Sequence, residues 1–166
     1  MDEAPFDPSR LIRVLLEHGV AFVVIGGVAA NLLGSPTVTV DLDVCYERSR
    51  ANLEALAAAL LALGARPREV ESDLVLPLDA RTLLLGDSFT FATDAGPLDC
   101  LGTPSGTGGY ADLARKAARF RLGELEFGVA SLDDLIRMKR AAGRPKDRIE
   151  LEVLGALRDE LDGEPS

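Results

Sequence analysis

Two aspartates separated by one leucine are the residues of this chain best suited to bind a cation. Asp41 and Asp43 lie in the apolar run Val40-Asp41-Leu42-Asp43-Val44. Because side chains alternate along a β-strand, both carboxylates would lie on one face of a strand, about 7 Å apart along it. At about 4 Å, two carboxylates repel each other by about 4 kcal/mol at an effective dielectric of 20. An apolar strand does not offset this repulsion, so the pair predicts a divalent metal ion.

A glycine pair, Gly26-Gly27, precedes the aspartates by thirteen intervening residues, positions 28–40. It follows a Val/Ile-rich run at 21–25, which predicts a strand, a glycine turn and then a helix to residue 33. Glycine N–H groups at the positive end of a helix form an anion site, although turns also use glycine for backbone reasons alone. Without the glycines, two solvated acids on the open face of an edge strand would be the preferred interpretation. Together, the two motifs suit a metal–triphosphate complex.

Turn and capping residues divide the rest of the chain into short elements. Helices are expected at 8–18, from a cap at Ser49 to a stop at Gly64, at 110–118, from a cap at Ser131 to residue 142, and from Pro145 onward. Strands are expected at 39–46, 69–70, 74–76, 82–85, 89–92 and 98–101, followed by a connecting loop at 102–109 and a hairpin at 119–128 turned at Gly123. This order predicts an α/β (α+β) fold with a mixed sheet.

Length and composition indicate one domain over residues 1–158 and a polar, flexible tail at 159–166, because 166 residues with 47% hydrophobic content suffice for one core. The acidic start of the chain is unlike a signal peptide, and apolar stretches are too short for a membrane span. Cys45 and Cys100 lie in apolar runs, as expected of buried thiols in a reducing compartment. We therefore expect a cytoplasmic protein without a disulfide.

The net charge of −9 is unfavourable for a broad nucleic-acid surface. Basic residues are nevertheless concentrated at 137–148, which holds six of the 18 Lys and Arg residues and one acid, so this segment carries +5 and the rest of the chain −14. The segment is either a solvated helical surface, the more common case for charge runs, or one basic patch that a polyanion could contact.

Ile25-Gly26-Gly27 and Asp41-Leu42-Asp43 resemble the signature of the nucleotidyltransferase superfamily with the DNA polymerase beta-like fold. In that family a third acid follows on a later strand. The matching residue here is Asp99 in Pro97-Leu98-Asp99-Cys100-Leu101, with Asp79, Asp87 and Asp94 as competitors. Asp99 is preferred because the other three stand beside turn residues, where aspartate is common for local reasons.

The C-terminal segment 131–147 is similar to small bacterial stand-alone members of this superfamily, such as AbiEii-type toxins. The resemblance implies that Lys139 and the turn containing Arg144 and Lys146 face the active site. Helical spacing agrees for Lys139, because apolar residues at i−7, i−4 and i−3 place it along the apolar stripe. The alternative is a surface lysine whose stem covers the core.

The resemblance implies transfer of a nucleoside monophosphate from a nucleoside triphosphate such as ATP to an acceptor hydroxyl, with release of pyrophosphate. Asp41 and Asp43 would hold two Mg²⁺ ions. Asp99 would complete the site and act as general base, and the basic residues, with Gly26 and Gly27, would bind the triphosphate. The acceptor is left open: a small molecule, a tRNA end or a protein hydroxyl.

One departure from the family pattern is Thr37, where many members have arginine. A second interpretation is therefore a non-catalytic nucleotidyltransferase-like module that binds nucleotide, or a partner protein as in a toxin–antitoxin pair. Bound metal together with turnover would distinguish the enzyme from this module.

Overall fold

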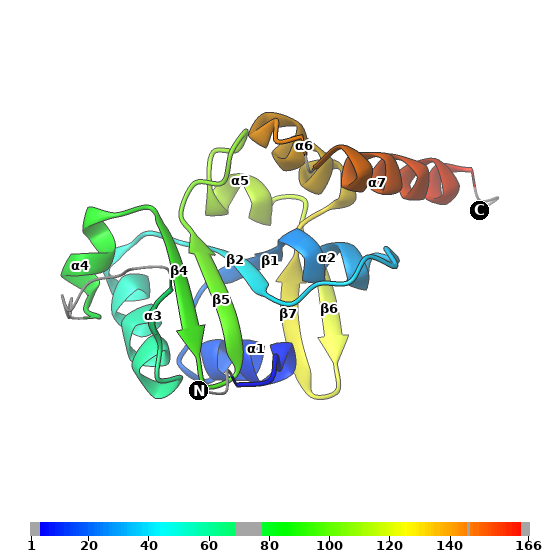
Figure 1. The fold of residues 1–166 in the computed structure, drawn as a ribbon. Coiled ribbons are helices and arrows are strands. Elements are labelled where there is room, and N and C mark those ends of the chain that lie inside the picture. Colours follow the sequence, from blue (N-terminus) through cyan, green and yellow to red (C-terminus); the bar gives the residue numbers. More distant parts are fainter. Residues whose placement is uncertain (1–3, 69–77, 146, 164–166) are drawn as a thin grey trace.

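The computed structural model describes residues 4–68, 78–145 and 147–163, and its strands form one mixed sheet flanked by helices (Figure 1). The order across the sheet is β3-β4-β5-β2-β1-β7-β6. The strands are β1 (Phe22–Ile25), β2 (Leu42–Tyr46), β3 (Arg66–Pro67), β4 (Ser88–Thr93), β5 (Gly96–Leu101), β6 (Ala118–Leu122) and β7 (Leu125–Val129). The helices are α1 (Pro8–Glu17), α2 (Gly26–Leu32), α3 (Arg50–Ala62), α4 (Ala80–Leu85), α5 (Tyr110–Ala114), α6 (Leu132–Ala142) and α7 (Asp147–Asp162).

The centre of the sheet is formed by β5, β2 and β1. Strand β2 pairs antiparallel with β1 and parallel with β5, which places Asp43 opposite Ile25 on one side and beside Asp99 on the other. Strand β1 pairs parallel with β7, and the hairpins β4–β5 and β6–β7 are antiparallel. The third predicted acid is thus brought next to the second by strand register alone.

The core lies between the sheet and the helices packed on it. All four residues of β1 are buried, as expected of a central strand, and leucines of α1 and α3 belong to the same buried core. Side-chain caps begin three helices as the sequence predicts: Asp7 for α1, Ser49 for α3 and Ser131 for α6. The connector at 102–109 and the hairpin turn at Gly123, with φ of +62°, also agree with prediction.

The strand predicted at 39–46 begins later than expected, at Leu42, so Asp41 precedes it. Strand β1 ends at Ile25, opposite Asp43, and the chain then turns into α2. Residues 39–41 consequently have no antiparallel partner on β1. Their geometry is set by the Thr39 hydroxyl, which donates to the Asp41 carbonyl at 3.1 Å.

One prediction for the middle of the chain is wrong. Residues 82–85, predicted as a strand, belong to the helix α4, and Asp79 caps this helix by accepting from the Thr82 N–H. The Leu-rich sequence suits either structure, and the cap decides for the helix. Strand β3 was not predicted, whereas the strands expected at 89–92 and 98–101 are present as β4 and β5. The strands expected at 69–70 and 74–76 lie outside the described residues.

The C-terminal region differs in its boundaries. Helix α5 ends at Ala114 rather than at residue 118, because Ala118 already pairs with Val129 in the β6–β7 hairpin. The last helix begins at Asp147, and it continues to Asp162 through residues expected to form a polar tail. In Figure 1, α7 extends away from the sheet. Among the described helices, none has the length and apolar character needed to span a membrane.

Candidate functional site

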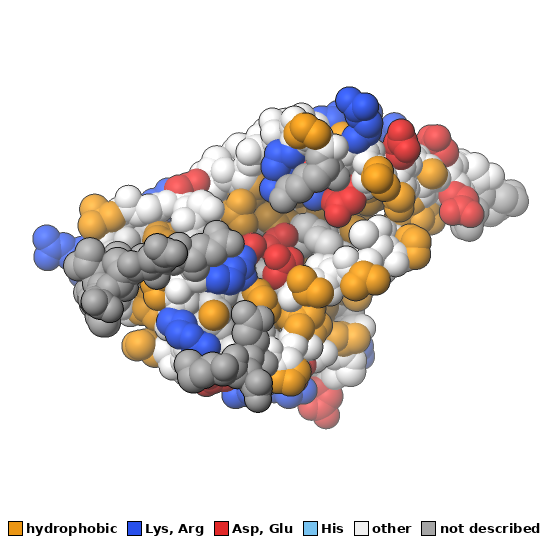
Figure 2. Space-filling model, in the orientation of Figure 1, with side chains coloured by type: hydrophobic (Ala, Val, Ile, Leu, Met, Phe, Trp, Pro, Cys, Tyr) orange, Lys and Arg blue, Asp and Glu red, His pale blue; other side chains and the backbone are white. Residues whose placement is uncertain are grey.

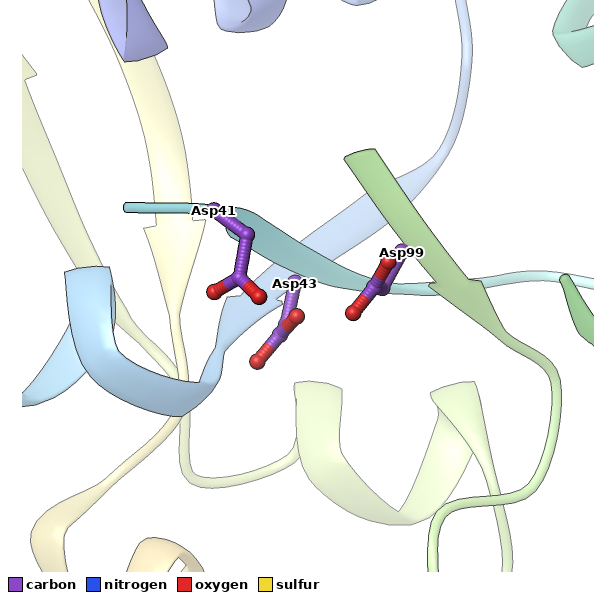
Figure 3. Close-up of side chains that lie close together, drawn as sticks. All are labelled: Asp41, Asp43 and Asp99. Atoms are coloured by element: carbon purple, nitrogen blue, oxygen red, sulfur yellow. The ribbon is translucent and has the colours of Figure 1, made fainter. Parts of the chain in front are cut away.

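Asp41, Asp43 and Asp99 form a cluster of three carboxylates. Asp41 comes from the loop before β2, Asp43 from β2 and Asp99 from β5. One oxygen from each lies within 4.8 Å of the others, and the three side chains project to the same side of the sheet (Figure 3). Carboxylate oxygens at this spacing are ligands that Mg²⁺ and Mn²⁺ prefer. The cluster therefore has the chemistry and spacing to hold a divalent cation.

Asp43 carries the strongest electrostatic strain of this cluster. Burial raises its pKa to about 8, and the negative charges of Asp41 and Asp99 and a hydrogen bond with Asp99 act in the same direction. Burial also raises the pKa of Asp99, against the lowering effect of Arg68. In the absence of a cation, the raised pKa of Asp43 favours the protonated form of its carboxyl. A metal ion would replace this proton, so the residues fit the ion that the sequence predicts.

The glycine turn lies directly against the side chains of Asp43 and Thr39. Gly26 has φ of +68°, in the left-handed region, and a Cβ at this position would overlap the Asp43 carboxylate. A Cβ on Gly27 would lie 2.6 Å from the Thr39 Oγ1. Both glycines are therefore required for close packing beside the acids, a role that adds to the anion site expected from the sequence.

The lysine predicted to face inward does so. Lys139 on α6 is 22% exposed, and its Nζ lies 3.2 Å from Asp147 Oδ1 and also bonds Glu150, both on α7. Arg144 donates from Nε to Asp147 Oδ2 at 2.8 Å. Burial alone would lower the pKa of Lys139, but Glu150 and Asp147 outweigh it and raise the pKa, so this lysine stays cationic. Lys146, predicted to act with these residues, lies outside the described residues.

Asp147 is the buried centre of this group. Burial alone would raise its pKa, but hydrogen bonds from Arg144 and Lys139 lower the pKa below its ordinary value. Neither Asp147 nor Glu150 was assigned a role from the sequence. Asp147 and Glu150 are spaced i, i+3 and so lie on one face of α7, but their contact with Lys139 depends on the packing of α7 on α6.

Arg68 is a basic residue of the site that sequence reasoning missed. Its Nη2 lies 2.7 Å from Asp99 Oδ1, and both side chains are largely buried. Arg68 follows the two-residue strand β3 at the edge of the sheet. No local pattern in the sequence indicates this contact, because it depends on the register of three strands.

These residues line one cavity of about 940 Å³. Acidic side chains gather near the centre of this face, with basic and hydrophobic side chains around them (Figure 2). The lining combines the three aspartates, the glycine pair, Arg68, Lys139, Arg144 and Asp147 with apolar groups from α2, α6 and α7, including Ala30, Leu135, Met138 and Leu154. A cavity of this size accommodates a nucleotide-sized ligand.

The competing acids lie elsewhere. Asp79 caps α4, and Asp87 accepts from Arg48 and from the Thr103 N–H. Asp94 lies in the turn between β4 and β5. Thr37, the departure from the family pattern, does line the cavity, and its carbonyl accepts from the Asn31 side chain.

Three of the six basic residues of the segment 137–148, namely Arg137, Lys139 and Arg144, form ion pairs within the fold. Arg137 pairs with Asp112 on α5 and with the buried Asp134. The predicted cap of α6 is present, because the Ser131 hydroxyl accepts from the Asp134 N–H, while the Asp134 carboxylate pairs with Arg137. With Lys139 and Arg144 also paired, much of the local positive charge is neutralised within the fold.

Comparison with solved structures shows the fold of nucleotidyltransferases. A proposed nucleotidyltransferase from Thermotoga maritima superimposes with a TM-score of 0.53 at 14% identity, covering 97% of this chain and 98% of that one. The aminoglycoside nucleotidyltransferase ANT(2″)-Ia, solved in complex with adenylyl-2″-tobramycin, gives a TM-score of 0.53 at 15% identity, covering 93% and 87%. No protein-family model and no curated protein sequence matches the chain. The predicted mixed sheet flanked by helices is confirmed.

Proposed function

We propose that this protein is a metal-dependent nucleotidyltransferase, which moves a nucleoside monophosphate from a nucleoside triphosphate to an acceptor hydroxyl and releases pyrophosphate. The observation that carries the proposal is the convergence of Asp41, Asp43 and Asp99 in one cavity with Lys139 and Arg144. The shared fold supports it, because both compared proteins are named for nucleotidyl transfer.

The three aspartates would hold two Mg²⁺ ions. Ions bound at such a pair of sites stabilise both the entering and the leaving oxygen of an in-line displacement. Asp99 would accept the proton of the acceptor hydroxyl as its oxygen attacks the α-phosphorus. The bond from this phosphorus to the bridging oxygen then breaks, and pyrophosphate leaves.

Lys139, Arg144 and Lys146 would neutralise the triphosphate. Asp147 and Glu150 fix the ammonium group of Lys139 at the cavity wall, so little side-chain entropy is lost when an anion binds there. Gly26 and Gly27 would let the triphosphate approach the backbone of the turn.

A transfer assay tests the proposal. Purified protein, Mg²⁺ and each of the four α-labelled ribonucleotides are incubated with an antibiotic panel, with total RNA and with cell protein. The expected result is a labelled acceptor in one panel, equimolar pyrophosphate, and loss of both in Asp43→Ala. Asp94→Ala, which removes an acid outside the cavity, is the matched control. Transfer that is unchanged in Asp43→Ala would reject the metal assignment.

A non-catalytic nucleotide-binding module is the second candidate, and Thr37 favours it. The cavity wall carries an uncharged side chain where many superfamily members have a basic one. This candidate predicts Mg²⁺-dependent nucleotide binding that requires Asp43, without transfer to any acceptor in the panel. Binding measurements alongside the assay therefore separate the two.

The acceptor class is open among a small molecule, a tRNA end and a protein hydroxyl. A more specific form of this proposal is that the protein is a toxin of the AbiEii kind, which acts by the same chemistry and has an antitoxin partner. It predicts growth arrest on expression of the wild-type chain and normal growth with Asp43→Ala at equal protein level. The free, buried Cys45 and Cys100 agree with a cytoplasmic setting for such an enzyme.

A further inference from the structure

Arg68 places a permanent positive charge on one of the three metal-site acids. Its Nη2 lies 2.7 Å from Asp99 Oδ1, and its side chain is 27% exposed against 18% for Asp99. A bond at this distance between partly buried partners is charge-assisted and stronger than an ordinary surface ion pair. The guanidinium therefore occupies one oxygen of a carboxylate that belongs to the candidate metal site.

The backbone makes this contact specific. Strand β4 lies between Arg68 and Asp99: the Arg68 N–H donates to the Thr90 carbonyl at 2.9 Å, and Thr90 is the register partner of Asp99 on β5. The Arg68 side chain crosses β4, where Nη1 also donates to the Phe91 carbonyl at 3.4 Å. Asp99 is thus the carboxylate that this arginine is positioned to reach.

The other described basic side chains of the cavity are not paired with the three aspartates. Lys139 pairs with Asp147 and Glu150, and Arg144 with Asp147, so both are held by acids outside the metal cluster. Of the basic side chains described in the cavity lining, Arg68 alone is paired with a member of the cluster.

We propose that Arg68 competes with the divalent metal for Asp99, so that the guanidinium stabilises the metal-free cluster and must release this carboxylate when the second metal position fills. The inference rests on the metal site of the proposed function. Arg68 would then be a positioning residue, because its bond to Asp99 sets the metal concentration at which the second metal position fills. Because binding linkage is reciprocal, removal of the competitor must tighten metal binding.

Equilibrium titration with Mn²⁺ in the absence of nucleotide tests this competition, with free Mn²⁺ measured by electron paramagnetic resonance. Arg68→Gln is expected to bind Mn²⁺ about five- to tenfold more tightly than the wild type, a range at the low end of ordinary coupling between sites. Its metal-free form is expected to melt at a lower temperature, and added Mn²⁺ to raise its Tm by more. Unchanged or weaker Mn²⁺ affinity in Arg68→Gln would overturn the proposal.

Arg66→Gln is the matched control for charge. It removes the same charge two residues away, from an exposed side chain on β3 whose guanidinium bonds the Gly64 carbonyl. A general electrostatic effect would tighten Mn²⁺ binding equally in both variants and would also overturn the proposal. The proposal predicts less than a twofold change for Arg66→Gln.

A measurement on the wild-type chain covers the case in which Arg68→Gln does not fold. The side-chain ¹⁵N signals of Arg68, assigned by their loss in Arg68→Lys, should show restricted rotation of the guanidinium without metal and free rotation at saturating Mg²⁺. Rotation that stays restricted when Mg²⁺ is bound would contradict the competition.

Failure of this inference is distinguishable from failure of the proposed function. If Mn²⁺ binding is lost in Asp43→Ala but unaffected by Arg68→Gln, the metal site stands and the competition is wrong. If Asp43→Ala binds Mn²⁺ as the wild type does, the metal site itself is wrong.

Discussion

Gly26 and Asp43 pack so closely that a methyl group on the glycine would occupy the position of the Asp43 carboxylate. The two residues are neighbours because β1 ends opposite Asp43 and the chain turns at once into α2. The glycine motif and the aspartate motif, separated by thirteen residues in the sequence, thus meet at the contact of Gly26 with Asp43.

Gly26→Ala is expected to displace the Asp43 carboxylate and to weaken Mn²⁺ binding by about tenfold or more, as changes beside metal ligands commonly do. The left-handed φ of Gly26 adds a backbone cost of about 1–2 kcal/mol. Gly19→Ala is the control, because Gly19 has a similar φ of +72° and its new methyl group would meet no atom of the described residues within 4 Å. Equal metal affinity in the two variants would show that the Gly26 contact does not matter for the site.

The protonation of Asp43 gives a pH dependence for the metal-free protein. The pKa of Asp43 rises from its ordinary value of 3.8 to about 8 in the fold, chiefly because of burial. Between these values the folded state binds the additional proton, so this group makes stability fall as pH rises, by up to about 1.4 kcal/mol per pH unit. Asp43→Asn removes this contribution and should be more stable at pH 7 by at least about 1 kcal/mol, or about 2–4 °C in Tm.

Urea unfolding in EDTA from pH 5 to pH 8 measures this difference, with Asp94→Asn as the control at an acid outside the cluster. The wild type and Asp94→Asn should lose stability over this range more steeply than Asp43→Asn. Parallel curves for all three proteins would mean that Asp43 is ionised in the metal-free fold.

Lys139 should contribute to nucleotide binding and Arg140 should not. Lys139 lines the cavity, whereas its neighbour Arg140 on α6 is exposed and absent from the lining. Because a hydrogen bond to a charged group contributes about 1.5–3 kcal/mol, Lys139→Met should weaken triphosphate binding by about tenfold or more. Arg140→Met should change the affinity less than twofold. Isothermal titration with each variant checks this, and a similar loss in both would favour a diffuse basic surface.

We expect Arg137 to stabilise the folded state. It pairs with Asp134, whose side chain is 5% exposed, and with Asp112 on α5. Arg137→Met would leave a buried carboxylate without this partner, a change that costs about 3–5 kcal/mol. Arg115→Met removes a guanidinium from the same Asp112, but that side chain is 77% exposed, so its cost should stay below about 1 kcal/mol. Urea unfolding of both variants provides the comparison, and equal stability would remove the structural role assigned to Arg137.

The parts of the site that the sequence predicts are those set by local patterns. Asp99 is recognisable as an acid between apolar strand residues, and parallel pairing of β2 and β5 then places it beside Asp43. Helical spacing places Lys139 inward. In both cases a short-range pattern fixes the face on which the side chain lies, and the predicted geometry follows.

What the sequence did not predict depends on long-range register. Arg68 reaches Asp99 across β4, and its strand β3 has two residues, too few for any periodic signal. Asp147 and Glu150 hold Lys139 because α7 packs on α6, a contact that no local pattern encodes. The error at α4 is local instead: its short apolar run was interpreted as a strand, and the helix is set by the cap at Asp79.

The most direct test of the account is Mg²⁺-dependent binding of a triphosphate, because it requires no knowledge of the acceptor. Isothermal titration with an analogue that cannot be cleaved between the α- and β-phosphates compares the wild type, Asp43→Ala and the control Asp94→Ala, each in Mg²⁺ and in EDTA. We expect the wild type and Asp94→Ala to bind in Mg²⁺, and binding to weaken by about a hundredfold or more on adding EDTA or in Asp43→Ala. Binding of equal strength with and without Mg²⁺, or undiminished in Asp43→Ala, would contradict it.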